Sequence, residues 1–173
     1  MRHLIAGLCL LGAATTPSVA DDLYAKYFAD VDGGRPCYAR YYDATHLKSH
    51  PKQTVRRIAV DFDQSQRDDK GKNTAGDFQG GFGFMLKRSA EWYTQEMHCS
   101  TAAAHFDCFL EGDGGRFRLI PAGRGLRLEV VNGGGGTDQI VVEGSDFGEF
   151  GIPGGDDRVF ILPRGERKLC EAA

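Results

Sequence analysis

The sequence lacks any long apolar run beyond its first residues, which argues against a protein that spans a membrane with helices. The one apolar run covers residues 4–14, follows the basic Arg2, and is shorter than the roughly 20 residues that a spanning helix needs. A small-x-small pattern, Ser18-Val19-Ala20, comes after it. This combination predicts a signal peptide over residues 1–20 that is cleaved after Ala20. The mature protein is then expected to be periplasmic or secreted, without membrane insertion.

An excess of positive charge is also missing. The 173 residues include 21 basic and 24 acidic side chains, which give a formal net charge of −3 at pH 7. Loss of Arg2 with the signal peptide makes the mature chain slightly more acidic. Because proteins that bind nucleic acid or anionic membranes present a basic surface, we expect neither as a partner. We expect a protein or a carbohydrate of the cell envelope instead.

Motifs for nucleotide binding and nucleophilic catalysis are missing as well. No G-x-G-x-x-G sequence opens a helix, and Gly144-Ser145-Asp146 does not fit the G-x-S-x-G pattern of a hydrolase nucleophile. Paired glycines such as Gly80-Gly81 come a few residues before aromatic strand segments, and we interpret them as hairpin turns. We therefore expect no cofactor and assign no catalytic residue.

Cysteines, by contrast, are well represented. Cys9 is lost with the signal peptide, and the remaining four, Cys37, Cys99, Cys108 and Cys170, predict two disulfides in an exported protein. The intervals between them are 62, 9 and 62 residues, so that a shift of 71 residues places the first pair on the second. This symmetry favours Cys37–Cys99 and Cys108–Cys170. The pairing Cys37–Cys170 with Cys99–Cys108 is also symmetric and stays open.

The same shift aligns other segments, for example Val55–Val60 with Leu126–Val131. We interpret this as a duplication that produced two tandem repeats of roughly 70 residues. The predicted organisation is a signal peptide (1–20), an N-terminal helix and lead-in (21–36), a first β repeat (37–99), a linker (100–107), a second β repeat (108–170) and a tail (171–173).

Strand signals dominate the mature chain. Short segments are rich in β-branched and aromatic residues, and several alternate apolar and polar residues, as in a strand with one solvated face. They predict an all-β fold with about eight antiparallel strands in one barrel-like or sandwich-like body. A short helix should precede it, because four apolar residues between Leu23 and Phe28 recur at helical spacing. Residues Ser89–His105 fit either a helix or a strand. The expected strands are Tyr38–Tyr42, Val55–Phe62, Phe82–Leu86, Phe117–Ile120, Leu126–Val131, Ile140–Val142 and Val159–Leu162.

His46 and His50 form an H-x-x-x-H pair, the spacing that places two imidazoles on one face of a helix to bind zinc. The glutamate that follows the first histidine in zinc proteases is missing, and Pro51 disfavours helical geometry at His50. A third ligand would have to come from Asp61, Asp63 or another distant group. A metal site and an ordinary polar loop are both compatible with this segment.

Candidate partner-binding residues are aromatic and acidic. Tyrosine and tryptophan are favoured at interfaces because they combine an apolar ring with a hydrogen-bonding group, which singles out Tyr41, Tyr42 and Trp92. Tyr41 and Tyr42 are neighbours in an expected strand, so one of the two should point away from the core. Asp68 and Asp69 lie in a long polar segment that is typical of an exposed loop.

Two functions are compatible with this pattern. The favoured one is a non-catalytic binding module of the bacterial envelope, such as an inhibitor or a scavenger, because the chain combines export and disulfides with no catalytic motif. The alternative is an exported hydrolase that uses either a metal at His46 and His50 or acid–base groups in a groove between the repeats. Alanine at both histidines should abolish the activity and metal uptake of the hydrolase but leave a binding module intact.

Overall fold

The computed structural model describes residues 19–28, 36–61, 76–131, 139–142 and 148–171. Most of the predicted signal peptide, residues 1–18, lies outside these described residues, and so do three of the candidate site residues, Asp63, Asp68 and Asp69.

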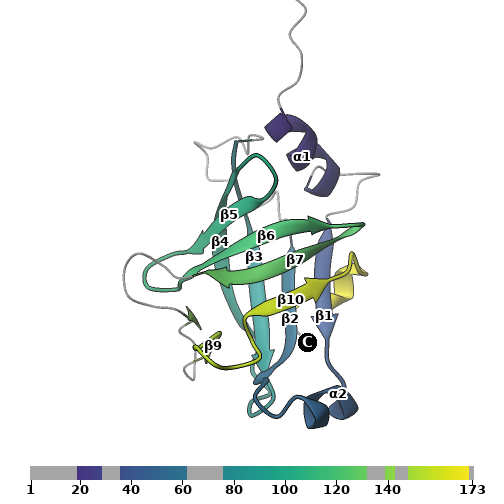
Figure 1. Cartoon of the computed structure of the whole chain (residues 1–173), viewed down its shortest axis with the longest axis vertical. Helices are drawn as coiled ribbons and strands as arrows, with labels where there is room; N and C mark the ends of the chain where they lie inside the picture. Colours follow the sequence, from purple (N-terminus) through teal and green to yellow (C-terminus); the bar gives the residue numbers. More distant parts are fainter. Residues whose placement is uncertain (1–18, 29–35, 62–75, 132–138, 143–147, 172–173) are drawn as a thin grey trace, which may run out of the picture.

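The described part of the chain is mostly antiparallel β structure, as predicted (Figure 1). Within it, eight strands form one sheet in the order β1-β2-β3-β4-β5-β6-β7-β10, and the short strands β8 and β9 pair with each other. The strands are β1 (Cys37–Tyr41), β2 (Val55–Asp61), β3 (Asp77–Leu86), β4 (Tyr93–Thr101), β5 (Phe106–Leu110), β6 (Arg116–Ala122), β7 (Gly125–Val131), β8 (Ile140–Val142), β9 (Gly148–Phe150) and β10 (Val159–Leu162).

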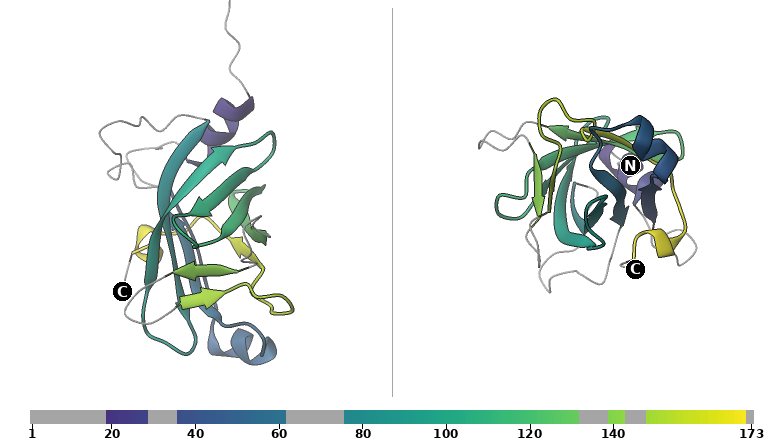
Figure 2. Two further views of the ribbon diagram at one scale, coloured as in Figure 1. Left: turned by 90° about the vertical axis from the view of Figure 1, so that its left-hand side faces the viewer. Right: turned by 90° about the horizontal axis from the view of Figure 1, so that it is seen from below.

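The large sheet curls until its two edge strands nearly meet (Figure 2). The N–H of Ala39 in β1 donates to the carbonyl of Pro163, just after β10, at 3.2 Å, and the N–H of Gly165 donates to the carbonyl of Cys37 at 2.9 Å. A single β-bridge joins Tyr38 to Arg164. The sheet therefore has an enclosed inner face and a solvent-facing outer face.

The helices are short, and the two α-helices lie at opposite ends of the sheet (Figure 1). The predicted N-terminal helix is α1 (Val19–Tyr27), so cleavage after Ala20 would fall in its first turn. Helix α2 (Ala44–Ser49) lies at the opposite end and begins at the cap residue Asp43, whose Oδ1 accepts the N–H of His46 at 2.8 Å. The 3₁₀ helix η2 (Arg167–Leu169) follows β10. No helix of the described residues is long and apolar enough to cross a membrane.

The inner face is packed with aromatic rings. Phe82 and Phe84 of β3 both point inward because alternate strand residues share a face, and each is at most 1% exposed. The ring of Phe82 lies 5.1 Å from that of Phe117 in β6, and the ring of Phe84 lies 5.1 Å from that of Tyr93 in β4. Rings from the smaller elements complete this core. Phe28, directly after α1, packs on Phe78 and Phe106, and Phe150 of β9 packs on Phe84 and Phe160.

The two predicted disulfides are present, but the pairing that the repeat favoured is wrong. The bonds are Cys37–Cys170, with Cα atoms 5.9 Å apart, and Cys99–Cys108, with Cα atoms 4.1 Å apart. Cys99 and Cys108 are directly opposite each other in the β4–β5 hairpin, and the closure of the sheet brings the C-terminal segment to Cys37. Strand register, rather than spacing along the chain, therefore decides which cysteines meet.

The tandem repeat is not confirmed by the structure. A shift of 71 residues relates β1 to β5 and β2 to β7, yet β1 pairs directly with β2, whereas β6 lies between β5 and β7. The segment that would correspond to β6 contains α2. Residues 100–107, expected as a linker, form the turn and adjoining ends of the β4–β5 hairpin within one continuous sheet.

Candidate functional site

The outer face of β2, β3 and β4 carries a hollow of about 380 Å³, which we call the outer groove. Its floor is made of small residues, because Gly81 and Gly83 of β3 point outward between the inward Phe82 and Phe84, and Ala59 of β2 lies beside them. The outer groove is lined by Ala59, Asp61, Gly81, Phe82, Gly83, Trp92, Thr94, Gln95, Glu96 and Cys170.

Trp92 forms one wall of the outer groove and lies directly against Gly83. A Cβ atom at Gly83 would be 2.5 Å from Trp92 Cζ2, so the indole occupies the space that any other residue would need. The guanidinium of Arg57 lies 4.4 Å from the centre of the indole ring. This cation–π contact and the glycine together fix the position of Trp92.

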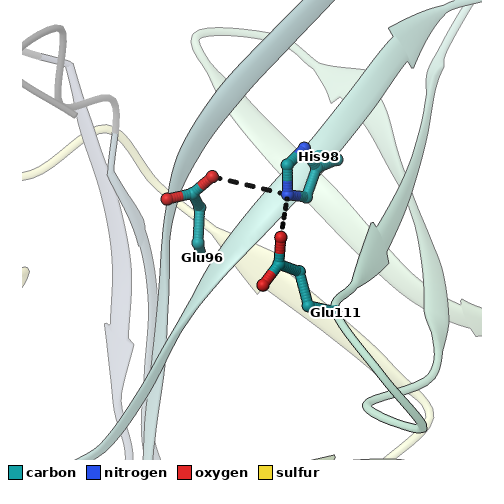
Figure 3. A group of neighbouring side chains, drawn as sticks. All are labelled: Glu96, His98 and Glu111. Carbon is teal, nitrogen blue, oxygen red and sulfur yellow. Dashed lines mark hydrogen bonds and ion pairs between the residues drawn. The ribbon is translucent and has the colours of Figure 1, made fainter. Parts of the chain in front are cut away.

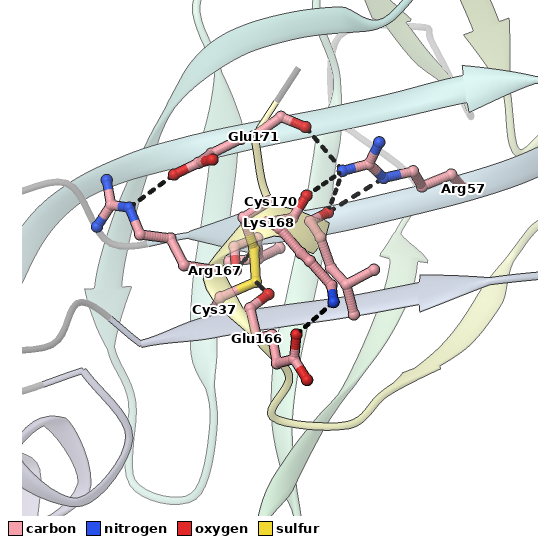
Figure 4. Close-up of a disulfide and its surroundings, with 9 residues drawn as sticks. Cys37, Arg57, Glu166, Arg167, Lys168, Cys170 and Glu171 are labelled. Atoms are coloured by element: carbon pink, nitrogen blue, oxygen red, sulfur yellow. Dashed lines mark hydrogen bonds and ion pairs between the residues drawn. A yellow bond between two sulfur atoms is a disulfide. The ribbon is translucent and has the colours of Figure 1, made fainter. Parts of the chain in front are cut away.

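Arg57 also holds the C-terminal segment against this wall (Figure 4). Its side chain donates hydrogen bonds to the carbonyl oxygens of Lys168 at 3.0 Å, Leu169 at 2.6 Å and Glu171 at 2.7 Å. Burial lowers the pKa of Arg57 from its ordinary value, and these carbonyl acceptors offset the loss of water around its charge. With the disulfide Cys37–Cys170, the contacts make this wall of the groove rigid.

The opposite part of the groove is acidic. Asp61 of β2 and Glu96 of β4 both pair with Gly81 of β3, so that the two carboxylates flank a residue without a side chain. A Cβ at Gly81 would lie 2.5 Å from Asp61 Oδ1, which shows that this carboxylate leans over the glycine. Thr94 and Gln95 add neutral polar groups. A carboxylate pair beside an indole can accept hydrogen bonds from hydroxyl groups while an apolar ligand face packs against the ring.

Glu96 takes part in a second arrangement beside the groove, which we call the Glu–His–Glu cluster (Figure 3). His98 Nε2 lies 3.4 Å from Glu96 Oε1 and 3.2 Å from Glu111 Oε1. One ligand atom from each of the three residues lies within 4.8 Å of the others, so they could hold a metal ion. Glu111 also borders a second hollow of about 370 Å³, which shares Thr94 and Gln95 with the outer groove.

The histidine pair predicted from the sequence comes together without the expected carboxylate. The rings of His46 and His50 stack with centroids 4.1 Å apart. Nε2 of His46 hydrogen-bonds to Gln53 Oε1 at 3.0 Å, and Nδ1 of His50 lies 2.9 Å from the carbonyl oxygen of His46. Asp61 lies at the far end of β2 from α2, because it pairs with Cys37 at the start of β1. The candidate third ligand Asp63 is outside the described residues.

The aromatic candidates fall in three environments. Trp92 lines the outer groove, whereas Tyr41 is 58% exposed on β1 and Tyr42 is buried. The two tyrosines therefore point to opposite sides, as strand alternation predicted. Burial raises the pKa of the Tyr42 hydroxyl, partly opposed by the charge of Arg40. Asp68 and Asp69 cannot be placed, because they lie outside the described residues.

Sequence reasoning missed several residues of this site. Gly80-Gly81 was interpreted as a turn, but both residues lie inside β3. Glu96 and His98 are two residues apart, a spacing that places them on one face only if the segment is a strand. The third member, Glu111, is brought to them by the pairing of β4 with β5. If Ser89–His105 had been assigned to a strand, the sequence would have predicted that Glu96 and His98 lie on the same face.

Comparison with known proteins identifies no relative. No family model matches the chain, and no curated protein or solved structure matches it significantly.

Proposed function

We propose that this chain is an exported, non-catalytic binding protein of the bacterial envelope, and that its outer groove binds carbohydrate. The predicted signal peptide and the two disulfides support export, because disulfides persist in oxidising compartments. In this proposal the mature protein begins at Asp21 and works in the periplasm or outside the cell.

The observation that carries the proposal is the combination of Trp92 with the carboxylates of Asp61 and Glu96 over a glycine floor. A sugar ring presents apolar C–H groups on its faces and hydroxyl groups around its edge. The indole suits the former, and the carboxylates accept hydrogen bonds from the latter. A hollow of about 380 Å³ is within the range of small-ligand sites, which favours a short saccharide over a folded protein as the occupant.

The rigid wall of the outer groove supports the proposed binding function. Trp92 is positioned by Gly83 and Arg57, and Arg57 is tied to the C-terminal segment next to the disulfide Cys37–Cys170. A preformed site loses little conformational entropy when a ligand binds, which increases the affinity that a few contacts can provide.

The proposal can be tested with the mature protein, residues 21–173, and a panel of soluble envelope glycans, beginning with peptidoglycan fragments. Calorimetry should detect saturable binding of at least one glycan. Trp92→Ala and Asp61→Asn should each weaken that binding at least about tenfold, because each removes a central contact. Tyr41→Ala is the matched control, since Tyr41 is an exposed aromatic residue outside the groove, and it should leave the affinity unchanged. Equal affinity in all four proteins would contradict the proposal.

A second candidate is an exported glycan hydrolase, and one observation favours it. Asp61 and Glu96 flank Gly81 from two sides, and pairs of carboxylates on either side of a glycosidic bond are the usual machinery of glycosidases. The same experiment separates the two functions. New reducing ends that appear with the wild-type protein but not with Asp61→Asn would establish the hydrolase, whereas an intact bound glycan supports the binding protein.

A further inference from the structure

We infer that the Glu–His–Glu cluster of Glu96, His98 and Glu111 is a binding site for a divalent transition-metal ion, for which Zn²⁺ is the best match. This site differs from the histidine pair in α2 that the sequence suggested, and it does not depend on the carbohydrate proposal.

The spacing of the ligand atoms fits a tetrahedral ion. Two atoms bound to Zn²⁺ at 2.0–2.1 Å with a tetrahedral angle lie about 3.3 Å apart. Nε2 of His98 is 3.4 Å from Glu96 Oε1 and 3.2 Å from Glu111 Oε1. Only a small closing movement of one glutamate toward the other is then needed, since all three atoms already lie within 4.8 Å of one another.

The balance of charge and protons also favours a cation. Among the described residues, His98 is the ion-pair partner of both Glu96 and Glu111, and no lysine or arginine pairs with either carboxylate. Nε2 can carry one hydrogen, so it cannot donate a well-directed hydrogen bond to two carboxylates at once. A dication at this point contacts both carboxylates and balances their charge.

The imidazole is already oriented for this role. The ring of His98 stacks on Phe109 of β5, with centroids 5.1 Å apart and planes 16° apart. On its other side, Nδ1 of the ring lies 3.2 Å from the amide nitrogen Nε2 of Gln79 in β3. A half-turn of the Gln79 amide would bring its oxygen to Nδ1–H, and Nε2 would then be unprotonated with its lone pair toward the two glutamates. A ligand histidine held through its second nitrogen in this way is typical of protein metal sites.

The site is accessible from solvent and from the outer groove. The side chains of Glu96, His98 and Glu111 are 32%, 23% and 67% exposed. Three protein ligands leave a fourth position of a tetrahedral ion open. Glu96 also lines the outer groove, so an ion held by the cluster would lie beside the groove, and water or an oxygen atom of a bound molecule could complete its coordination.

The test uses metal-free mature protein and Zn²⁺ alone, without glycan. Calorimetry should show one Zn²⁺ per chain, and Co²⁺ in its place should give the intense visible absorption of a tetrahedral site. His98→Gln and Glu111→Gln should each lower the Zn²⁺ affinity at least about tenfold and abolish the Co²⁺ band. All three side chains lie on the outer face, so these variants should keep the far-UV spectrum of the wild type.

The matched control is the double variant His46→Gln/His50→Gln, which removes the other close pair of histidines but leaves the cluster intact. It should bind Zn²⁺ like the wild type. The inference is overturned if the wild type takes up no Zn²⁺, or if His98→Gln binds as well as the wild type while the double variant does not. Glycan binding, measured separately on Asp61→Asn, reports on the outer groove alone, so failure of one proposal can be told from failure of the other.

Discussion

The two faces of strands β2, β3 and β4 are built from opposite kinds of residue. The inner face of β3 carries Phe82 and Phe84 in a close-packed aromatic core, whereas its outer face carries Gly81 and Gly83 beneath Trp92. Each face has its own disulfide. Cys99–Cys108 belongs to the buried core, and Cys37–Cys170 packs with Ala39, Ala59 and Trp92 on the outside. One strand therefore supplies bulk for stability on one side and space for a ligand on the other.

The first prediction compares the two disulfides. Serine in place of Cys37 and Cys170 should lower the free energy of unfolding by about 5 kcal/mol in the chain-entropy estimate, because this bond closes a loop with a sequence separation of 133. Serine in place of Cys99 and Cys108 should cost about 3 kcal/mol, because the separation is 9. Urea unfolding of the two double variants measures the difference. Equal losses would contradict the chain-entropy estimate, which assigns the larger loss to the bond that closes the longer loop.

The second prediction concerns the bulk of the inner face. Phe84→Ala should lower the free energy of unfolding by about 3–5 kcal/mol, because the alanine leaves a cavity among Phe82, Tyr93 and Phe150. Thr94→Ala on the outer side of β4 is the control and should change it by less than about 0.5 kcal/mol. Denaturant unfolding measures the loss of stability in both variants. Similar losses would contradict the contrast between a close-packed inner face and an outer face that contributes little to stability.

The third prediction is a pH effect of the inner face. Burial raises the pKa of Tyr38 to about 12 from its ordinary value of 10.0, against the opposing charge of Arg164. Its hydroxyl donates to the carbonyl oxygen of Tyr27 at 2.6 Å. Since the unfolded chain loses this proton first, the stabilisation is complete below pH 10 and is lost as the pH rises to about 12, a decrease of about 2 to 3 kcal/mol.

Alkaline titration of stability should therefore be flatter for Tyr38→Phe than for the wild type between these two pH values. Tyr41→Phe serves as the outer-face control, because Tyr41 is 58% exposed, and its curve should follow that of the wild type. If the Tyr38→Phe curve is as steep as the wild-type curve, the buried hydroxyl is not the cause of the loss of stability at high pH.

The smallest effect on stability is expected on the outer face. Gly83→Ala places a Cβ 2.5 Å from Trp92 Cζ2 and forces the indole to move, at a cost of about 1–3 kcal/mol. Because Trp92 is the single tryptophan of the chain, its fluorescence maximum reports the movement directly. Gly155→Ala, where the nearest atom would be 3.3 Å from the new Cβ, should leave the emission spectrum unchanged. An unshifted maximum in Gly83→Ala would mean that the glycine does not position the indole.

Most strand positions could be predicted from alternation, because alternation reflects the local contrast between a buried and a solvated face. The segment Leu126–Val131 matches β7 to within one residue. Strand β5 was missed because the cysteine spacing suggested a boundary, and the first two residues of β5 were assigned to a linker. Correct disulfide pairing was beyond the sequence, since it depends on which strands become neighbours when the sheet curls.

The residues of the candidate site, too, could be predicted only in part. Trp92 was a candidate partner-binding residue because of its aromatic ring, and it lines the outer groove, but its role in binding stays a prediction. The Glu–His–Glu cluster did not stand out. Glu96 and His98 lie in β4, whereas Glu111 directly follows β5, and their meeting depends on a register that pairs His98 with Phe109. Gly81 of the groove floor was misinterpreted together with Gly80, because a glycine pair inside a strand has the same local sequence as a turn.

The disulfide between Cys37 and Cys170 also determines how the protein responds to mechanical tension. If the two ends of the chain are pulled apart, the load passes from residue 37 to residue 170 through the sulfur–sulfur bond. None of it is carried by the hydrogen bonds of the sheet between these residues, so only the segment before Cys37 and the last residues can extend. The β body between these two residues would thus stay folded under stretching forces for as long as this bond stays oxidised.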